Sequence, residues 1–474
     1  MDFLQPLLLV FVIFLASCYF VHQRKIVGTK NLPPGSLGWP LLGETHQFLF
    51  NKVENFVGQR MKKYSSKVFK TNILGEPTVV FSGPDGNKLI CTGEPKLVRF
   101  SYTESQRSLF DIPLPSNDSS VPPKNLKLGP AGAARLMGFL KPDSLVRYTG
   151  EIESITNHHF RTHWEGKEEV KAYQLTKTFV LTLSCHFFLG LNKPDCIAKL
   201  VSKFDDLHFG IHSLHLNIPG TTYNRASKAA AAIRKEVRII MQEKIAAMSK
   251  GAAMTDLLSQ MIVAEQGGKF EPHFGVCNTI VGLMSASYKS VVNALTFMIK
   301  HIGEKQDVYQ KILFEQTELA ASRGTSMELD WENLQKMKYT WAVAMETMRI
   351  TPPTPGAFRQ ATTSFNYGGY TIPKGWKIFW AFNATNKSPE YFPEPEKFDP
   401  SRFEGNGPAP YTFVPFGGGP RTCPGKEYTR FLILIFIHNL VRKLKWEVLF
   451  PNEEISGIFM PIPAKGLPIR LQPL

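Results

Sequence analysis

The sequence predicts a mainly α-helical protein with minor β structure, preceded by a transmembrane helix. Residues 3–21 are almost uninterrupted apolar sequence, residues 140–350 have mostly helical apolar spacing, and prolines divide the chain beyond Thr351 into short strands and loops. The length of 474 residues, with 43% hydrophobic and 12% aromatic residues, excludes a disordered chain, a collagen-like repeat and a disulfide-stabilised miniprotein.

Residues 1–25 are predicted to anchor the chain in a membrane. At a rise of about 1.5 Å per residue, roughly twenty residues span a hydrocarbon core of about 30 Å, and the apolar run at 3–21 has this length. Arg24 and Lys25 follow the run whereas only Asp2 precedes it, so the positive-inside rule places the remaining chain in the cytosol. A cleaved signal peptide is the alternative, and it is disfavoured because no basic residue precedes the apolar run.

The chain after the anchor is predicted to form a stalk and one large domain. Residues 26–45 contain several prolines, which lack a backbone donor and fix φ, so a stiff stalk is expected there. Residues 46–474 show no linker or charge run that would divide them. Within this domain, the alternation and turn signals of residues 66–91 indicate a small β-hairpin region, and the last helix is expected from about Cys423 to Lys445.

The charge balance favours an anionic partner. Lysine and arginine exceed aspartate and glutamate by 15, which suits a lipid surface or an acidic protein. The cations are scattered, and there is no zinc-finger spacing, so no nucleic-acid partner is expected. Six cysteines without regular spacing do not form a disulfide framework, which indicates a reducing compartment.

The residues best suited to chemistry lie in the segment FVPFGGGPRTCPG at 413–425. Three consecutive glycines allow the backbone to approach a flat ligand closely. Cys423 precedes an apolar helix, whose first N–H groups and dipole favour a thiolate. A thiolate is a strong axial donor to haem iron and promotes O–O cleavage, and Arg421 has the fork geometry that pairs with a haem propionate. The alternative is a buried cysteine beside an ordinary glycine turn.

This segment resembles the haem-binding signature of the cytochrome P-450 superfamily. Its five fixed positions are occupied by Phe416, Gly419, Arg421, Cys423 and Gly425. The resemblance implies the fold of that family, a helical haem-thiolate domain with small β-sheets. It also implies that Cys423 ligates the iron of haem b (iron protoporphyrin IX) and that the other four residues surround this cofactor.

Other residues extend the resemblance. Glu346 and Arg349 resemble the family's Glu-x-x-Arg helix, in which the two side chains lie on one helix face and form a structural ion pair. In the family a further arginine completes this network, and Arg402 matches that arginine. Arg359 resembles the strand arginine that contacts a propionate, although a plain surface arginine is the alternative. Arg135 is the one candidate for the propionate contact that the family's early helix supplies.

The long helix before residue 300 departs from the family's pattern. The family places an acid and a hydroxyl there, which relay protons to dioxygen. Ser290 retains a hydroxyl, but Lys289 replaces the acid. We therefore predict a relay that uses Ser290 with water, a substrate hydroxyl or Lys289 as the donor, or else an enzyme that loses reducing equivalents as peroxide. The altered relay also suggests oxidation at a position other than carbon 28.

Segments such as LPPGSLGWPLLGE and PIPAKGLPIRL resemble the plant family of pentacyclic triterpene oxidases, which includes β-amyrin 28-oxidases. The resemblance covers essentially the whole chain, and residues 101–125 match the variable loop that roofs the substrate pocket. It implies a triterpenoid-biosynthesis enzyme of plant secondary metabolism, a haem-thiolate monooxygenase that hydroxylates an oleanane or ursane scaffold such as β-amyrin, α-amyrin, oleanolic acid or ursolic acid. Oxygen is the co-substrate, and electrons come from NADPH through the flavins of an NADPH-cytochrome reductase.

The resemblance also implies a single-pass protein of the endoplasmic reticulum membrane with a cytosolic catalytic domain. Two other functional classes stay open. Lys289 prompts an O2-independent haem-thiolate isomerase or dehydratase, and a non-catalytic, membrane-tethered ligand binder is the third class. Positions 28, 2α and 6β of the scaffold all stay open as the site of oxidation.

Overall fold

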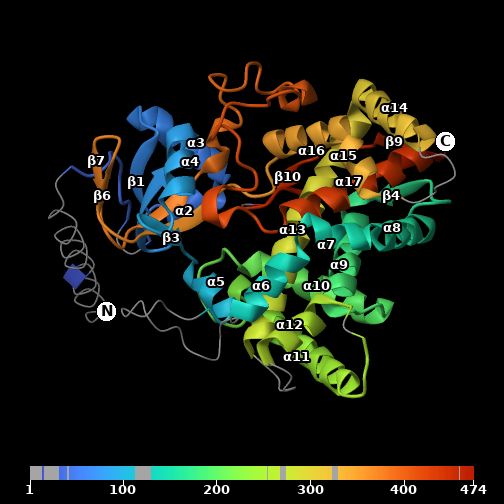
Figure 1. The fold of residues 1–474 in the computed structure, drawn as a ribbon. Coiled ribbons are helices and arrows are strands. Elements are labelled where there is room, and N and C mark those ends of the chain that lie inside the picture. Colours follow the sequence, from blue (N-terminus) through green and yellow to red (C-terminus); the bar gives the residue numbers. More distant parts are fainter. Residues whose placement is uncertain are drawn as a thin grey trace, which may run out of the picture. The chain divides into compact units, whose positions relative to one another are not determined.

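The structure is a computed structural model that describes residues 13–14, 31–39, 42–112, 130–253, 255–266, 274–322, 329–457 and 459–473 (Figure 1). Apart from Ile13 and Phe14, the predicted membrane span lies outside the described residues. Within these ranges, the structure contains no helix with both the length and the apolarity needed to cross a membrane. The chain divides into two compact units. The first consists of Met1–Tyr102, Pro355–Pro395 and Ala409–Thr422, and the second of Thr103–Thr354, Glu396–Pro408 and Cys423–Leu474.

The first unit is built on a five-stranded sheet with the strand order β1-β2-β8-β5-β3. Strands β2 and β8 are parallel, and the other neighbours are antiparallel. The strands of this unit are β1 (Val68–Ile73), β2 (Glu76–Phe81), β3 (Val98–Phe100), β5 (Ala357–Ala361) and β8 (Lys377–Trp380), with β6 (Phe365–Tyr367) and β7 (Tyr370–Ile372) as a separate hairpin. Its helical segments are α2 (Thr45–Phe50), α3 (Val53–Tyr64), α4 (Gly83–Gly93), η2 (Phe382–Thr385) and η4 (Gly419–Arg421).

The predicted hairpin at residues 66–91 is confirmed in its first part and wrong in its second. Strands β1 and β2 pair as an antiparallel hairpin, but the residues that follow form the helix α4. Its buried side chains Asn87, Ile90 and Cys91 recur at helical spacing, and a proline occupies its first turn, where the missing N–H costs nothing. The apolar residues of this second part therefore follow the period of a helix and not the alternation of a strand.

Part of the predicted stalk lies against this unit. Lys70 on β1 donates its backbone N–H to the carbonyl of Pro34, and its ammonium donates to the carbonyl of Pro33, both at 2.8 Å. Gly35 forms a parallel bridge with the same residue. Residues 33–35 are therefore attached to the sheet edge instead of being a free spacer.

The core of the first unit connects the sheet to the loop at 409–422. Trp380 on β8 donates its indole N–H to Asn87 of α4 at 2.7 Å, and Asn87 donates its amide to the carbonyl of Tyr411 at 2.7 Å. Phe81, Ile378 and Ile90 pack around these groups and are fully or almost fully buried. The loop that precedes Cys423 thus rests on a buried, hydrogen-bonded support.

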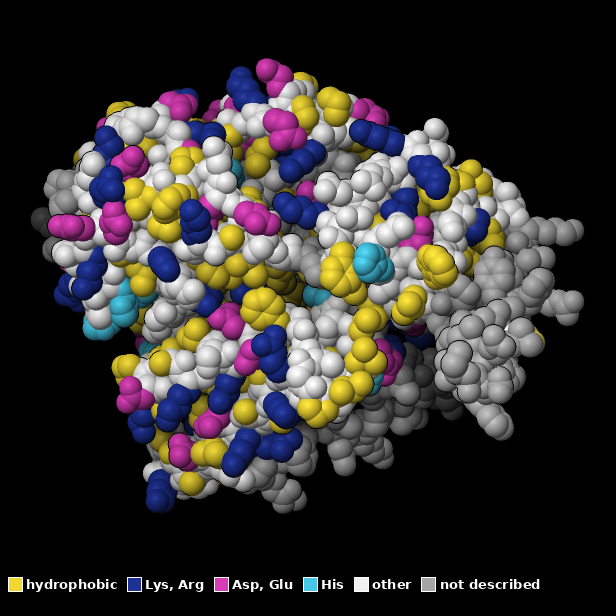
Figure 2. Space-filling view, turned by 180° about the vertical axis from the view of Figure 1, so that it is seen from behind, with side chains coloured by type: hydrophobic (Ala, Val, Ile, Leu, Met, Phe, Trp, Pro, Cys, Tyr) yellow, Lys and Arg dark blue, Asp and Glu magenta, His cyan; other side chains and the backbone are white. Residues whose placement is uncertain are grey.

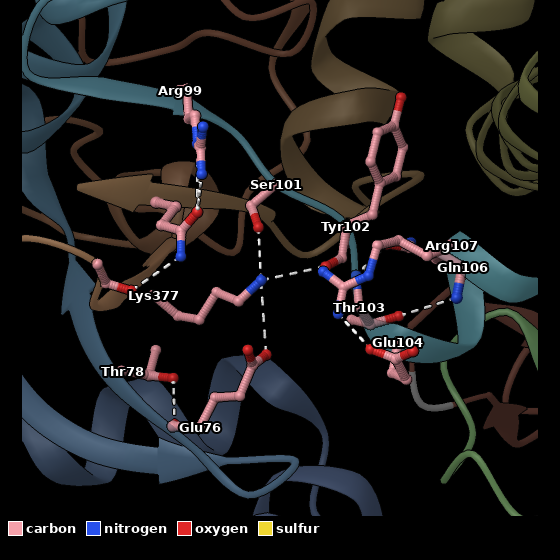
Figure 3. Close-up of polar contacts among 12 residues, drawn as sticks. Glu76, Thr78, Arg99, Ser101, Tyr102, Thr103, Glu104, Gln106, Arg107 and Lys377 are labelled. Atoms are coloured by element: carbon pink, nitrogen blue, oxygen red, sulfur yellow. Dashed lines mark hydrogen bonds and ion pairs between the residues drawn. The ribbon is translucent and has the colours of Figure 1, made fainter. Parts of the chain in front are cut away.

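A buried lysine fixes the chain where β3 ends. Figure 3 shows the ammonium of Lys377 between three oxygen atoms: it donates to the hydroxyl of Ser101, donates to the carbonyl of Tyr102 at 3.2 Å, and pairs with a carboxylate oxygen of Glu76 at 3.5 Å. Lys377 is only 4% exposed, so these partners replace its lost hydration. Ser101 and Tyr102 are the first residues of the segment that resembles the variable roof loop.

The second unit is the helical part of the protein, and the predicted helical run of residues 140–350 is confirmed. Its helices are α5 (Glu104–Leu109), α6 (Pro130–Phe139), α7 (Pro142–Leu145), η1 (Val146–Tyr148), α8 (Thr149–His163), α9 (Ala172–Leu189), α10 (Pro194–Gly210), α11 (Thr222–Met248), α12 (Leu257–Gln266), α13 (Phe274–Glu304), α14 (Gln306–Ser322), α15 (Trp331–Lys336), α16 (Lys338–Ile350), η3 (Pro400–Phe403) and α17 (Lys426–Lys443). Two small antiparallel sheets complete it: β4 (Glu169–Lys171), β12 (Pro468–Pro473) and β9 (Leu444–Val448), and β10 (Ile455–Ser456) with β11 (Ile462–Pro463).

The 31-residue helix α13 lies in the core of this unit and contacts α9, α10, α11 and α17 (Figure 1). Met284, Val292 and Leu295 are fully buried along its length, as expected for a helix that is apolar on most sides. A hydrogen bond of 2.8 Å between the hydroxyls of Thr296 and Thr176 joins α13 to α9. The helix α17 begins three residues after Cys423, within a few residues of the predicted boundary.

On the face drawn in Figure 2, lysine and arginine side chains are interspersed with acidic ones. This distribution agrees with the scattered cations of the sequence. The excess of positive charge is spread over this face.

Candidate active site

The glycine loop before Cys423 is held tightly against α4. Gly417 and Gly419 have φ values of +68° and +66°, which favour glycine. A Cβ atom at Gly419 would lie 1.8 Å from the backbone oxygen of Cys91, and one at Gly418 would lie 2.7 Å from its Sγ atom. The glycines predicted to approach a flat ligand therefore also allow the loop to approach a helix. Phe416 lies half-buried immediately before them.

Cys423 is exposed and lies just before α17, and Gly425 is the N-cap residue of that helix. Although the side chain is accessible, surrounding protein atoms desolvate the sulfur and raise the pKa of the thiol, and a backbone hydrogen bond at Gly425 opposes this increase. Burial therefore opposes the thiolate that the sequence predicts, and the ligation of iron by Cys423 stays a prediction. A coordinated metal ion deprotonates such a thiol outright.

Two predicted propionate ligands, Arg359 and Arg421, share a single carboxylate. The Nε atoms of both arginines lie 3.2 Å from Glu94, each at a different carboxylate oxygen. Arg359 is buried and the side chain of Arg421 is 63% exposed. Burial lowers the pKa of Arg359, Arg421 adds to that effect, and Glu94 opposes it. Two guanidinium groups against one carboxylate leave a surplus positive charge, which fits the carboxylate groups of a haem.

The predicted ion-pair network is brought together in the second unit. Arg349 donates to both carboxylate oxygens of Glu346, at 2.7 and 2.8 Å, and both side chains are fully buried. The backbone N–H of Asp399 donates to Glu346 at 2.7 Å, Arg349 donates to the carbonyl of Lys397 at 3.1 Å, and Arg402 lies 3.7 Å from Glu346. The network thus fastens residues 397–402 to α16, which fits a structural role.

Ser290 and Lys289 lie on different faces of α13. The Ser290 hydroxyl donates to the carbonyl of Ala286 at 2.8 Å, and Ser290 is half-buried. Lys289 is 4% exposed, and its ammonium is directed to Asp205 of α10. No hydrogen bond joins Ser290 to Lys289 in the described part of the chain.

Lys289 belongs to a buried charge cluster that was not anticipated. Asp205 pairs with Lys177 of α9 at 2.5 Å and with Lys289 at 3.4 Å, and Tyr288 donates to Asp205 at 3.1 Å. Burial alone would raise the pKa of Asp205, but the two lysines outweigh burial and hold it below the ordinary value. Burial lowers the pKa of Lys289, Asp205 opposes this, and Lys177 adds to it.

Arg135 is exposed on α6 and lines a cavity of about 600 Å³. Arg147, Tyr148 and Gln260 line the same cavity, and none of the other predicted site residues does. The structure therefore places Arg135 in a basic surface cavity of the second unit.

Two acidic residues that pair with predicted site residues, Glu94 and Asp205, were not predicted. Glu94 carries no motif, so the sequence offered no signal for it. For Asp205 the signal was Lys289 itself, because a buried lysine is almost always paired. That signal does not say which of the 40 acidic residues is the partner.

A helical unit with small sheets, an accessible cysteine before an apolar helix and a buried Glu-x-x-Arg pair together define a haem-thiolate protein. Residues 169–463 match the family description "Cytochrome P450", and the chain belongs to this family. The family predicted from the signature is thereby confirmed, and membership implies haem as the cofactor. The glycine loop, the accessible sulfur and the surplus positive charge at the two arginines fit this group.

The chain is similar over its full length to plant relatives. A β-amyrin 28-monooxygenase of Solanum lycopersicum is 44% identical, with 100% of this chain and 99% of the relative covered. The corresponding enzyme of Vitis vinifera is 45% identical, with 96% and 94% covered, and a β-amyrin 6-β-monooxygenase of Solanum lycopersicum is 42% identical, with 98% of both chains covered. Among solved structures, the retinoic acid-bound cyanobacterial CYP120A1 has a TM-score of 0.82 at 26% identity, with 94% of this chain and 100% of that chain covered.

Proposed function

We propose that this protein is a cytochrome P-450 monooxygenase that hydroxylates a pentacyclic triterpene of the oleanane or ursane type. The observation that carries the proposal is the full-length similarity, at 40–45% identity, to enzymes named for the oxidation of β-amyrin. The relatives named for carbon 28 and for carbon 6 have nearly equal identity to this chain, so identity does not select the carbon.

The residues that would hold the haem are Cys423 at the iron and Arg359 and Arg421 at the propionates. When bound, the haem supplies the activation of dioxygen, and a thiolate ligand promotes O–O cleavage. The arginines are already paired with Glu94, so a propionate would share or replace that carboxylate and would neutralise the surplus positive charge. Glu346 and Arg349 would hold their part of the fold without contacting the substrate.

Proton delivery would depend on Ser290. Its hydrogen is directed at the carbonyl of Ala286, so its oxygen is available to accept a hydrogen bond from water or from a substrate hydroxyl. Lys289 is engaged by Asp205 on another face of the helix, which favours water over Lys289 as the donor to Ser290.

The membrane location and the electron donor are parts of the same proposal. The apolar run at 3–21 and the basic residues after it support a single-pass anchor in the endoplasmic reticulum membrane with a cytosolic enzyme. A net charge of +15 suits docking to an acidic, flavin-containing NADPH-cytochrome reductase.

The test is expression of the full chain with a reductase in a host that makes β-amyrin, α-amyrin and their 28-acids. A hydroxylated product that requires both NADPH and oxygen supports the proposal, and identification of the product assigns the carbon. Product formation without oxygen would indicate an isomerase or dehydratase. If the reduced carbon monoxide complex lacks a thiolate-type Soret band, or if Cys423→His retains that band and turnover, the thiolate assignment is wrong.

A further inference from the structure

Asn293 on α13 is a buried amide side chain without hydrogen bonds. The residue is 1% exposed, and within the described residues neither its Oδ1 nor its Nδ2 atom has a hydrogen-bond partner. Nearly all buried polar side chains in folded proteins are paired, because an unpaired one forfeits its hydration without compensation. An amide with four unused hydrogen-bonding positions in a well-packed helix therefore indicates a small polar ligand.

The position of Asn293 on the helix places it beside Ser290. At 3.6 residues per turn, Ala286, Ser290 and Asn293 lie on one face of α13. Along this face the exposure falls, since Ala286 is exposed, Ser290 is half-buried and Asn293 is buried. The face therefore leads from accessible surface to the unpaired amide.

The neighbouring polar residues of α13 are occupied elsewhere. Lys289 is directed to Asp205 on α10, and Thr296 is bonded to Thr176 on α9. Both side chains have these other partners, and within the described residues neither forms a hydrogen bond to Asn293.

The unused hydrogen-bond donors and acceptors of Ser290 and Asn293 suit one bridging water molecule. The Ser290 hydroxyl donates to Ala286 and retains free lone pairs, whereas Asn293 offers two donors and an acceptor oxygen. Residues three apart on a helix are about 5–6 Å apart at their Cβ atoms, which leaves room for a bridging water between short side chains. A buried water usually makes about three hydrogen bonds, and Ser290 and Asn293 supply two of them.

We propose that Asn293 is a positioning residue that holds a water molecule against the Ser290 hydroxyl, and that this water supplies the proton consumed in hydroxylation. The inference rests on the proposed function. It gives Asn293 a part in the proton relay, in which Lys289 replaces the acid that the family places there. A carboxamide is not an acid at neutral pH, so Asn293 only orients the water. Ser290 passes on its hydroxyl proton and regains one from the water, and the water regains a proton from bulk solvent.

The first experiment measures product formed per NADPH consumed, together with peroxide release, in the haem-loaded full chain. Asn293→Leu keeps the volume but removes the hydrogen bonds, and it is expected to lower this ratio about tenfold, as is typical when a residue that acts through another is lost. The KM for the triterpene should stay within about twofold, because Asn293 orients the water and does not bind the substrate. Asn293→Ser retains one hydroxyl and should recover part of the ratio.

The matched control is Thr296→Val, which also removes a buried polar group from α13 but on the side that faces α9. It should lower the melting temperature and leave the ratio of product to NADPH within about twofold of the wild type. A loss of coupling in Thr296→Val as large as that in Asn293→Leu would overturn the proposal, because a general disturbance of the helix would then explain both.

The second experiment does not depend on turnover. A crystal structure of the haem-loaded wild type should show a water at about 2.7–3.2 Å from both Asn293 and Ser290, and this water should be absent in Asn293→Leu. A substrate oxygen at this place, or no atom at all, would overturn the assignment.

The two proposals fail in different ways. A wild type without the thiolate-type Soret band and without NADPH-dependent product refutes the proposed function, and the inference about Asn293 fails with it. A wild type that passes both tests, together with an Asn293→Leu variant that is equally well coupled, refutes the inference alone.

Discussion

Replacing Arg349 with methionine should destabilise the protein strongly, because it leaves a fully buried carboxylate without its main partner. Glu346 would lose two hydrogen bonds of 2.7 and 2.8 Å from a guanidinium that is itself fully buried. The backbone N–H of Asp399 and the more distant Arg402 would remain, so the charge would be only partly compensated. Breaking a buried ion pair from one side costs about 3–5 kcal/mol.

This loss should appear as a fall in the melting temperature of roughly 6–20 °C, since 1 kcal/mol corresponds to about 2–4 °C in a folding unit of a few hundred residues. The assay is thermal unfolding of the full chain followed by circular dichroism, with haem content measured in parallel. Adding Glu346→Gln to Arg349→Met removes the buried charge and should restore part of the loss. The control is Lys336→Met, which breaks an exposed pair with Glu332 and should cost less than about 1 kcal/mol. Equal shifts for Lys336→Met and Arg349→Met, or no recovery in the double variant, would refute the reasoning.

The remaining predictions concern the charge cluster and the glycine loop. In a urea titration, Asp205→Asn should lower the free energy of unfolding by about 3–5 kcal/mol, because it leaves two buried ammonium groups without a counterion. Lys289→Met leaves one lysine paired with one aspartate and should cost less. A larger loss in Lys289→Met than in Asp205→Asn would contradict the pairing. Burial lowers the pKa of Lys289, so the unfolded chain binds more protons than the folded chain between that lowered pKa and 10.5. Melting curves should therefore show the wild type gaining stability relative to Lys289→Met as the pH rises through this range. Parallel pH profiles of the two proteins would contradict a lowered pKa of Lys289. Gly419→Ala adds a Cβ atom 1.8 Å from the Cys91 carbonyl oxygen at a backbone φ of +66°, so haem content and melting temperature should both fall. The control is Gly58→Ala, whose Cβ meets no atom within 4 Å and which should lower neither quantity.

Local motifs were the part of the site that the sequence could predict. Glu346 and Arg349 meet because three residues along a helix bring two side chains to one face, which is a property of spacing alone. The loop before Cys423 is equally local, since its glycines and its position before an apolar helix can be read directly. Long apolar helices were recognisable for the same reason, and α4 was missed because its short apolar pattern was ambiguous between the two periods.

Partners distant in the sequence were the part that could not be predicted. Glu94 is 327 residues from Arg421, and Asp205 is 84 residues from Lys289. Such pairs depend on how strands and helices assemble, which a single sequence does not state. The desolvation of the Cys423 sulfur was equally unpredictable, because it comes from residues that only the folded chain brings near.

The contacts of Lys377 mark a boundary that is useful for protein engineering. Its ammonium binds oxygen atoms of Ser101 and Tyr102, and the first segment of the first compact unit also ends at Tyr102. A chimaera that exchanges the roof segment between related oxidases should therefore join the donor sequence after this residue. The grafted segment would then start from a point that the recipient's own sheet already holds in place, so that differences in product could be attributed to the graft itself.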